Sequence, residues 1–161
     1  MKKVKVLFLC SDNYTRSITA EFCLKDFLKK ENIDFIEVSS AWTDASSDIS
    51  KYYNTHFDRM KELGIDTSSF TRTQFNERLL KNSDLIVAMA REHQEFVQQN
   101  YKIDIPLYNE LTVWKITSVV VSSPDNNQDI PQQIIKMTDY IYESTPGLLK
   151  YIINNKNKVL W

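Results

Sequence analysis

The apolar residues of this chain follow two patterns, one typical of buried strands and one typical of amphipathic helices. The first stretch is nearly continuous, with Val4, Val6, Leu7, Phe8 and Leu9, as expected for a parallel strand covered on both faces. Further on, apolar residues recur at the spacing of one helical stripe, at Ala20, Cys23, Leu24, Phe27 and Leu28. The opening segment is therefore predicted to be a strand ending at Cys10, a polar loop, and a helix beginning at Arg16.

The same alternation continues along the chain. We predict further strands over 33–42, 84–90 and 103–111, with Pro106 suited to an edge strand. Helices are predicted over 49–63, with Gly64 as its C-cap, over 91–101 and from 134 to 142, and a short helix or turn within 66–84. Thr145 and Pro146 suggest a break, after which a helix restarts. Strands alternating with helices predict an α/β fold with a parallel sheet.

Composition narrows the class of protein. The 161 residues suit a single domain, 1–161, and 20 basic against 21 acidic residues favour neither a nucleic-acid nor a membrane partner. The apolar run after the first lysines is too short for a targeting segment, and two cysteines do not make a disulfide framework. We therefore expect a cytoplasmic protein. No cluster has metal-ligand spacing, so we expect neither a metal nor a cofactor.

The candidate chemistry lies between the first strand and the first helix. A thiol at a helix N-terminus faces unpaired backbone N–H groups, so we expect the pKa of Cys10 to be lowered. Cys10, Arg16 and Ser17 form C-x5-R-S around the loop Ser11, Asp12, Asn13, Tyr14 and Thr15. These amides could surround a phosphate, the Arg16 fork could bind its oxygens, and Ser17 could donate to the sulfur. Asn13 tolerates the left-handed geometry that such a loop needs. Alternatively, Cys10 is simply a small buried hydrophobic residue.

The stretch VLFLCSDNYTRSITAEF resembles the active-site segment of the low-molecular-weight protein tyrosine phosphatases, V-L-F-V-C-x-G-N-x-C-R-S-P-x-A-E. The similarity continues through LGID (63–66), SDLIVAMAREH (83–93), LYNE (107–110) and GLLKYI (147–152). It implies a four-stranded parallel sheet of order 2-1-3-4, with helices on both faces and the phosphate-binding loop after the first strand. In three places the chain departs from the pattern: Asp12 replaces a glycine, Thr15 a cysteine and Ile18 a proline.

The resemblance implies hydrolysis of phosphotyrosine proteins or aryl phosphates, with Cys10 as nucleophile and Arg16 and residues 11–17 binding phosphate. Trp42 stands at the mouth of the implied site, either as a wall for the substrate ring or as a half-buried aromatic. The family's acid aspartate falls on Ser123, so Asp125, with Asp129 as the other nearby carboxylate, is the candidate acid, although both could be solvated turn residues. We expect His56 to be a hydrogen-bonded core histidine and His93 to lie on a solvated or half-buried face.

Two other functions remain open at this stage. Asp12 and the missing acid are consistent with a protein that binds phosphate or phosphopeptides and turns over poorly. An arsenate reductase type of thiol enzyme would need another cysteine to resolve its intermediate, and Cys23 is predicted to face the core. We expect a monomer or weak dimer.

Overall fold

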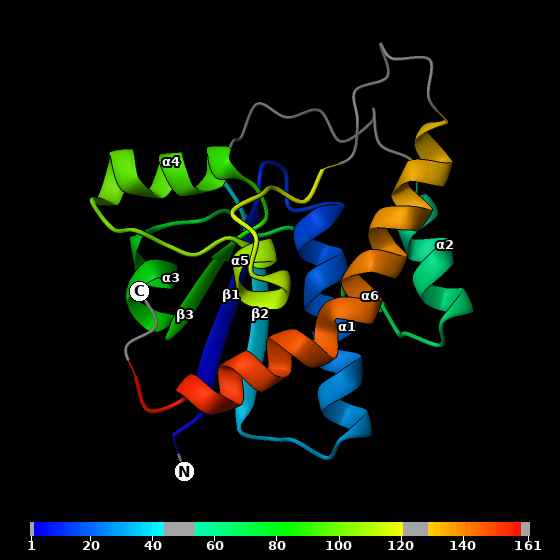
Figure 1. The fold of residues 1–161 in the computed structure, drawn as a ribbon, viewed down its shortest axis with the longest axis horizontal. Helices are drawn as coiled ribbons and strands as arrows, with labels where there is room; N and C mark the ends of the chain where they lie inside the picture. Colours follow the sequence, from blue (N-terminus) through cyan, green and yellow to red (C-terminus); the bar gives the residue numbers. More distant parts are fainter. Residues whose placement is uncertain (1, 44–53, 121–128, 159–161) are drawn as a thin grey trace.

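The computed structural model describes residues 2–43, 54–120 and 129–158. Its elements, in chain order, are β1 (Val4–Cys10), α1 (Arg16–Lys30), β2 (Ile36–Trp42), α2 (Thr55–Glu62), α3 (Glu77–Asn82), β3 (Leu85–Ala88), α4 (Arg91–Tyr101), α5 (Tyr108–Val113) and α6 (Ile130–Asn155) (Figure 1). None of the described helices is long and apolar enough to cross a membrane.

The described strands form a parallel sheet of order β2-β1-β3, with β1 in the centre. β1 pairs with β2 from Val4 opposite Ile36 to Cys10 opposite Trp42. The carboxyl ends of the strands thus meet at one edge, which is where ligands bind in open parallel sheets.

The prediction of a fourth strand over 103–111 is wrong. This segment contributes a single parallel bridge, between Ala88 and Leu107. Pro106 has no N–H to extend the ladder, although its carbonyl accepts from Ala88 N–H at 2.9 Å. Immediately afterwards the chain turns into α5, where the Glu110 carboxylate accepts from Leu107 N–H. The N-terminal helical turn therefore takes the place of further strand pairing.

β1 has a hydrophobic core on each face. Its even-numbered residues, Val4, Val6, Phe8 and Cys10, belong to a core that includes buried side chains of α1, α2, α5 and α6. Leu7 and Leu9 belong to a second core, with Leu80 of α3 and Val97 of α4. Because successive strand residues point to opposite faces, a continuous apolar run is what a strand covered on both sides requires.

α6 is one helix of 26 residues, so the predicted break at Thr145 and Pro146 is wrong. Pro146 lies inside the helix, which changes direction along its length (Figure 1). The proline cannot donate to the carbonyl four residues earlier. Nearby hydroxyls bond the carbonyls of this turn: Thr145 Oγ1 donates to Ile141 O, and Ser144 Oγ to Tyr140 O. Buried Leu148, Leu149 and Ile152 then anchor the second half in the core, so the helix bends instead of ending.

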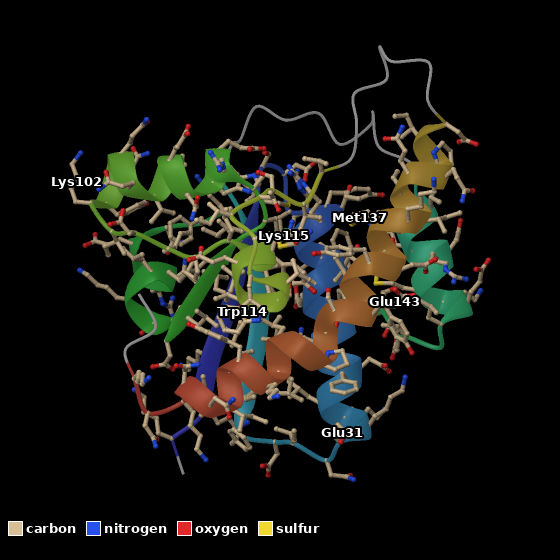
Figure 2. The ribbon with its side chains drawn as sticks, in the orientation of Figure 1. Glu31, Lys102, Trp114, Lys115, Met137 and Glu143 are labelled. Atoms are coloured by element: carbon tan, nitrogen blue, oxygen red, sulfur yellow. The ribbon has the colours of Figure 1, made fainter. Side chains whose placement is uncertain are left out.

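The predicted helix over 49–63 is observed as α2, Thr55–Glu62, its first predicted residues lying outside the described ranges. Gly64 follows in the left-handed region, at φ 78°, as predicted for a helix C-cap. α5 ends close to Trp114, whose side chain is 83% exposed and lies on the outer surface (Figure 2).

Candidate active site

The candidate loop connects the end of β1 to the start of α1 and lies at the carboxyl edge of the sheet (Figure 1). Cys10, the last residue of β1, is almost completely buried. The backbone N–H of Tyr14 donates to the Asp12 carboxylate, whereas the N–H groups of Ser11, Asp12, Asn13 and Thr15 donate to no acceptor among the described residues. The loop therefore offers the open donors that an oxyanion requires.

Asn13 fixes the shape of the loop. Its backbone adopts the left-handed conformation, φ 52°, as its residue type suggested. The buried side chain donates to Ser17 Oγ at 3.0 Å and to Ser40 Oγ at 2.7 Å, and it accepts from Thr73 N–H at 2.8 Å. One amide thus connects the loop to α1, β2 and the segment before α3, and its hydrogen-bonding capacity is nearly filled.

The Cys10 sulfur lies between the Ser17 hydroxyl and the Asp12 carboxylate. Because Asn13 donates to Ser17 Oγ, the Ser17 hydroxyl is free to donate to Cys10 Sγ, 2.9 Å away. The Cys10 thiol in turn donates to Asp12 Oδ1, at a distance of 3.6 Å. The expected contact between Ser17 and the sulfur is present, and the sulfur also has an acceptor beside it.

The expectation of a lowered Cys10 pKa is wrong for this state of the site. Burial raises the pKa of the Cys10 thiol, and the Asp12 carboxylate raises it further, whereas Arg16 and Ser17 lower it. The helix N-terminus and Arg16 both favour a lowered pKa, but loss of solvent and the Asp12 carboxylate outweigh them. The raised pKa favours the thiol form of Cys10, which donates to Asp12.

Asp12 is a buried carboxylate inside the loop, only 4% exposed. Its Oδ1 accepts from Tyr14 N–H at 3.1 Å as well as from the thiol, whereas Oδ2 has no hydrogen-bond donor among the described residues. A buried carboxylate oxygen without a donor is costly, so this atom marks an incomplete part of the site.

Arg16 is the first residue of α1 and follows the loop directly. Its Nη1 donates to Val119 O at 3.1 Å, and its Nη2 lies 3.7 Å from Glu92 Oε1 of α4. The guanidinium is thus held by two segments that are distant in sequence. Its side chain is 19% exposed, which leaves its remaining N–H groups available to a ligand.

His93 is fully buried against the loop, contrary to the expected solvated or half-buried face. Its Nδ1 accepts from Ala90 N–H at 3.0 Å, so Nε2 carries the proton and donates to Ser11 Oγ, also at 3.0 Å. Burial and the nearby Arg16 lower the His93 pKa to about 3, which keeps the ring neutral. Its position in the first turn of a helix that follows a buried strand was the signal that could have placed it near the loop.

His56 is buried and hydrogen-bonded, as expected, with Nε2 2.8 Å from the carbonyl oxygen of Tyr14. Tyr14 packs edge-on against the rings of His56, Phe57 and Phe70. This aromatic cluster, contributed by α2 and the segment after it, supports the middle of the loop and was not predicted from the sequence.

Trp42 lies beside the loop, opposite Cys10 in the sheet register. Its half-buried ring stacks with the Arg72 guanidinium at 5.7 Å, and Arg72 Nε donates to the Asp12 carbonyl oxygen at 2.7 Å. The two sequence interpretations, substrate wall and half-buried aromatic, are therefore compatible with the same position.

Comparison with known proteins identifies the family. The family model described as low molecular weight phosphotyrosine protein phosphatase matches residues 5–156. The chain belongs to this family. No curated protein gives a significant match.

Solved structures of phosphatases share the fold. The chain superposes on a YwlE mutant from Bacillus subtilis with a TM-score of 0.78 at 20% identity, covering 94% of this chain and 99% of that one. A low molecular weight protein tyrosine phosphatase from T. tengcongensis gives 0.74 at 24% identity, covering 92% and 99%. The YwlE arginine phosphatase from Geobacillus stearothermophilus gives 0.75 at 18%, covering 96% of each chain. Proteins with this fold thus carry names that refer to different substrates, phosphotyrosine in one case and phosphoarginine in the other.

In this member of the family, the candidate acids fall in different places. Ser123 and Asp125 lie outside the described residues. Asp129 is the N-cap of α6, and its Oδ1 accepts from Gln132 N–H at 3.2 Å. Capping α6 accounts for the hydrogen bond of the Asp129 side chain, and this role needs no part in catalysis.

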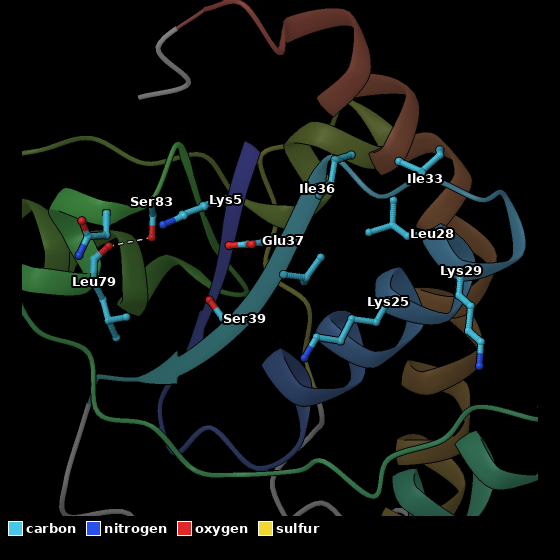
Figure 3. A pocket seen from close by; sticks show the side chains of 12 residues that line it. Lys5, Lys25, Leu28, Lys29, Ile33, Ile36, Glu37, Ser39, Leu79 and Ser83 are labelled. Carbon is cyan, nitrogen blue, oxygen red and sulfur yellow. Dashed lines mark hydrogen bonds between the residues drawn. The ribbon is translucent and has the colours of Figure 1, made fainter. Parts of the chain in front are cut away.

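Other surfaces of the described residues do not compete with this site. An open hollow of about 570 Å³ lies along the edge strand β2, where Lys5, Glu37 and Ser39 lie on one side and Leu28 and Ile33 on the other (Figure 3). No residue of the loop lines it. In the described part of the chain, no group of three or more His, Cys, Asp or Glu residues could hold a metal ion.

Proposed function

We propose that this phosphatase hydrolyses phosphate monoesters, with aryl phosphates such as phosphotyrosine as its substrate class, through a phosphocysteine on Cys10. The observation that carries the proposal is the position of the Cys10 sulfur: it lies in a loop of open backbone donors, 2.9 Å from the Ser17 hydroxyl. A phosphoryl group attached to this sulfur would have its oxygens within reach of those donors.

In the proposed reaction, the Cys10 thiol first releases its proton to solvent. The resulting thiolate attacks phosphorus, so that a P–S bond forms as the P–O bond to the leaving group breaks. The loop amides of residues 11–17 and the Arg16 guanidinium stabilise the charge on the transferring oxygens. Ser17 stabilises the sulfur anion by donating to it, both during attack and when sulfur leaves. Water then attacks phosphorus, which releases phosphate and restores Cys10.

The leaving phenol needs a proton, and we propose Asp125 as its source. A phenoxide such as that of tyrosine, with a conjugate-acid pKa of about 10, leaves poorly, whereas a nitrophenol leaves well without help. Asp125→Asn should therefore lower activity on phosphotyrosine much more than on nitrophenyl phosphate. Asp129→Asn is the matched control and should mainly weaken the cap of α6. Equal, small effects of Asp125→Asn on the two substrates would exclude Asp125 as the acid.

The reaction is tested by phosphate release from nitrophenyl phosphate, a phosphotyrosine peptide and a phosphoarginine peptide, since one structural neighbour is named an arginine phosphatase. We expect activity on the first two substrates, loss of it in Cys10→Ser, and retention in Cys23→Ser. Activity restricted to phosphoarginine would overturn the aryl substrate class while leaving the cysteine mechanism intact.

The second candidate function is phosphate or phosphopeptide binding with little turnover. Asp12 favours the low turnover of this alternative, because a carboxylate inside the loop raises the pKa of the Cys10 thiol and so opposes formation of the thiolate. The assay separates the two functions: binding of a phosphopeptide with no phosphate release would support this alternative. The thiol redox function has less support, since Cys23 is buried in α1 within the core.

We propose that one catalytic domain carries this function and works in a reducing compartment such as the cytoplasm, where a thiol nucleophile persists. The proposed mechanism requires neither a cofactor nor a metal, and one chain supplies every proposed residue, so a monomer or weak dimer suffices.

A further inference from the structure

The Asp12 carboxylate already occupies a phosphate-binding position of the loop. Its Oδ1 accepts from Tyr14 N–H at 3.1 Å and from the Cys10 thiol at 3.6 Å. A phosphoryl group transferred to Cys10 would lie next to the same sulfur and use the loop amides as donors. The carboxylate and the phosphoryl oxygens therefore compete for the same donor.

Among the described residues, no cation pairs directly with this carboxylate. Arg16 contacts Val119 O and Glu92, and Arg72 Nε donates to the carbonyl of Asp12, not to its carboxylate. Oδ2 lacks a donor among the described residues. When a dianion enters, two like charges would lie a few ångströms apart in a buried site, which strongly favours protonation of one of them.

Asp12 cannot readily leave the loop. Its backbone is fixed by the bond from Arg72, and its neighbour Asn13 is bonded to three parts of the chain. The side chain is short and 4% exposed. A protonated Asp12, by contrast, can stay in place and donate its O–H to the oxyanion.

We propose that Asp12 couples oxyanion binding to the uptake of one proton: as a carboxylate it excludes phosphate, and as a carboxylic acid it donates to the bound phosphoryl oxygen. This inference rests on the proposed function of the loop as the phosphate site. In the complex with a non-reacting oxyanion, the proton comes from solvent and Cys10 keeps its own proton as a thiol. The proposed reaction additionally requires Cys10 to lose its proton before attack.

Other charged or titratable groups surround this position. Cys10 and Arg16 belong to the loop and its ends, and Arg72 reaches Asp12 from the segment before α3. From α2, His56 contacts the Tyr14 carbonyl, and from α4, neutral His93 contacts Ser11 while Glu92 pairs with Arg16. The test must therefore assign the proton to Asp12 by substitution.

The test measures sulfate binding by NMR titration of the full chain, because sulfate itself takes up no proton near neutral pH. At about pH 7.5, Asp12→Asn and Asp12→Gly should each bind sulfate about tenfold or more tightly than the parent protein, since one nearby negative charge is removed. Asp104→Asn removes the same charge from an exposed position away from the loop and should change nothing. Unchanged affinity in both Asp12 variants would overturn the proposal.

The pH dependence of the parent protein gives a second measurement that needs no variant to fold. As the pH is raised, sulfate affinity of the parent protein should fall, with a limiting slope of about tenfold per pH unit for one coupled proton. This slope should disappear in Asp12→Asn. A flat profile in the parent protein, or an equal slope in Asp12→Asn, would contradict the coupling to Asp12.

These measurements are independent of turnover. If the chain proves inactive on every phosphate ester but sulfate binds with this pH dependence, the hydrolytic function fails and the role of Asp12 stands. If the chain is active but sulfate binding is independent of Asp12 and pH, the hydrolytic function stands and the proposed role of Asp12 fails.

Discussion

The residues around the sulfur have opposing effects on its chemistry. Ser17 and Arg16 favour a thiolate, whereas burial and Asp12 favour a thiol, and the second pair prevails in the ligand-free site. Asn13 belongs to neither pair, because its bonds fix the loop to Ser17, Ser40 and Thr73 instead. Reactivity and loop shape are thus set by different side chains within eight consecutive residues.

At this scale, Arg16→Lys tests whether the guanidinium does more than supply charge. A lysine keeps the charge but loses the planar pair of donors, so kcat/KM for nitrophenyl phosphate should fall by about a hundredfold or more. Arg78→Lys, on the exposed surface of α3, is the matched control and should leave the rate unchanged. Near-normal kinetics of Arg16→Lys would mean that another group binds the phosphoryl oxygens.

The residues of the candidate site are positioned by the end of a strand and the beginnings of two helices. β1 ends at Cys10, α1 begins at Arg16, and α4 begins one residue after Ala90, whose N–H donates to His93. His93 therefore links the start of α4 to Ser11 of the loop, and it can do so only as a neutral ring with Nδ1 as acceptor. Two helix N-termini are joined at the carboxyl edge of the sheet.

His93 should make the protein less stable in mild acid. Its pKa is about 3 in the folded chain and near 6.5 when unfolded, so the unfolded state binds the extra proton between these values. Stability should therefore be lost as pH falls below 6.5, by on the order of 3 kcal/mol at about pH 4.

Urea unfolding of the parent protein and His93→Gln between pH 7 and about pH 4 measures this contribution. The glutamine variant should be less stable at pH 7 but should lose less stability on acidification. Parallel pH profiles would show that His93 already ionises in the folded state.

Across the whole molecule, the sheet separates two cores, and the site lies where both end. The core on the α1 and α6 side contains the ionisable groups Cys23 and Tyr108. Tyr108 bonds α5 to α6 through Ser144 Oγ at 2.7 Å, and burial raises its pKa. Burial also raises the pKa of Cys23 to about 12, from 9.0.

These buried acids predict a loss of stability in alkali. Below pH 9 both forms of the chain keep the Cys23 proton, but between pH 9 and 12 the unfolded chain releases it first. The free energy of unfolding should thus fall above pH 9, by about 2 kcal/mol from Cys23 alone at about pH 10.5. Chemical denaturation of the parent protein and Cys23→Ala from pH 8 upward should show a shallower decline in the variant. Identical declines would assign the effect to other groups.

Much of this arrangement was determined by the sequence alone. Apolar periodicity placed β1, α1 and α4 correctly, because each buries its apolar residues on the faces that its own period creates. Spacing placed Cys10, Ser17 and the left-handed Asn13 within one loop, since local geometry depends on few residues. The resemblance to the family's loop pattern likewise lies within a short stretch and agrees with the family match over residues 5–156.

Tertiary structure decided what depends on distant partners. Burial, the largest cause, raised the pKa of Cys10, and the local Asp12 carboxylate added to it. The degree of burial could not be predicted from nearby charges along the chain. His93 and Arg72 reached the loop from 82 and 60 residues away, and packing against the core carried α6 through Pro146. The bridge at Leu107 stayed too short for a strand because α5 begins at the next residue. Solvent exclusion and long-range contacts are properties of the assembled chain, and they set the protonation state of the proposed nucleophile.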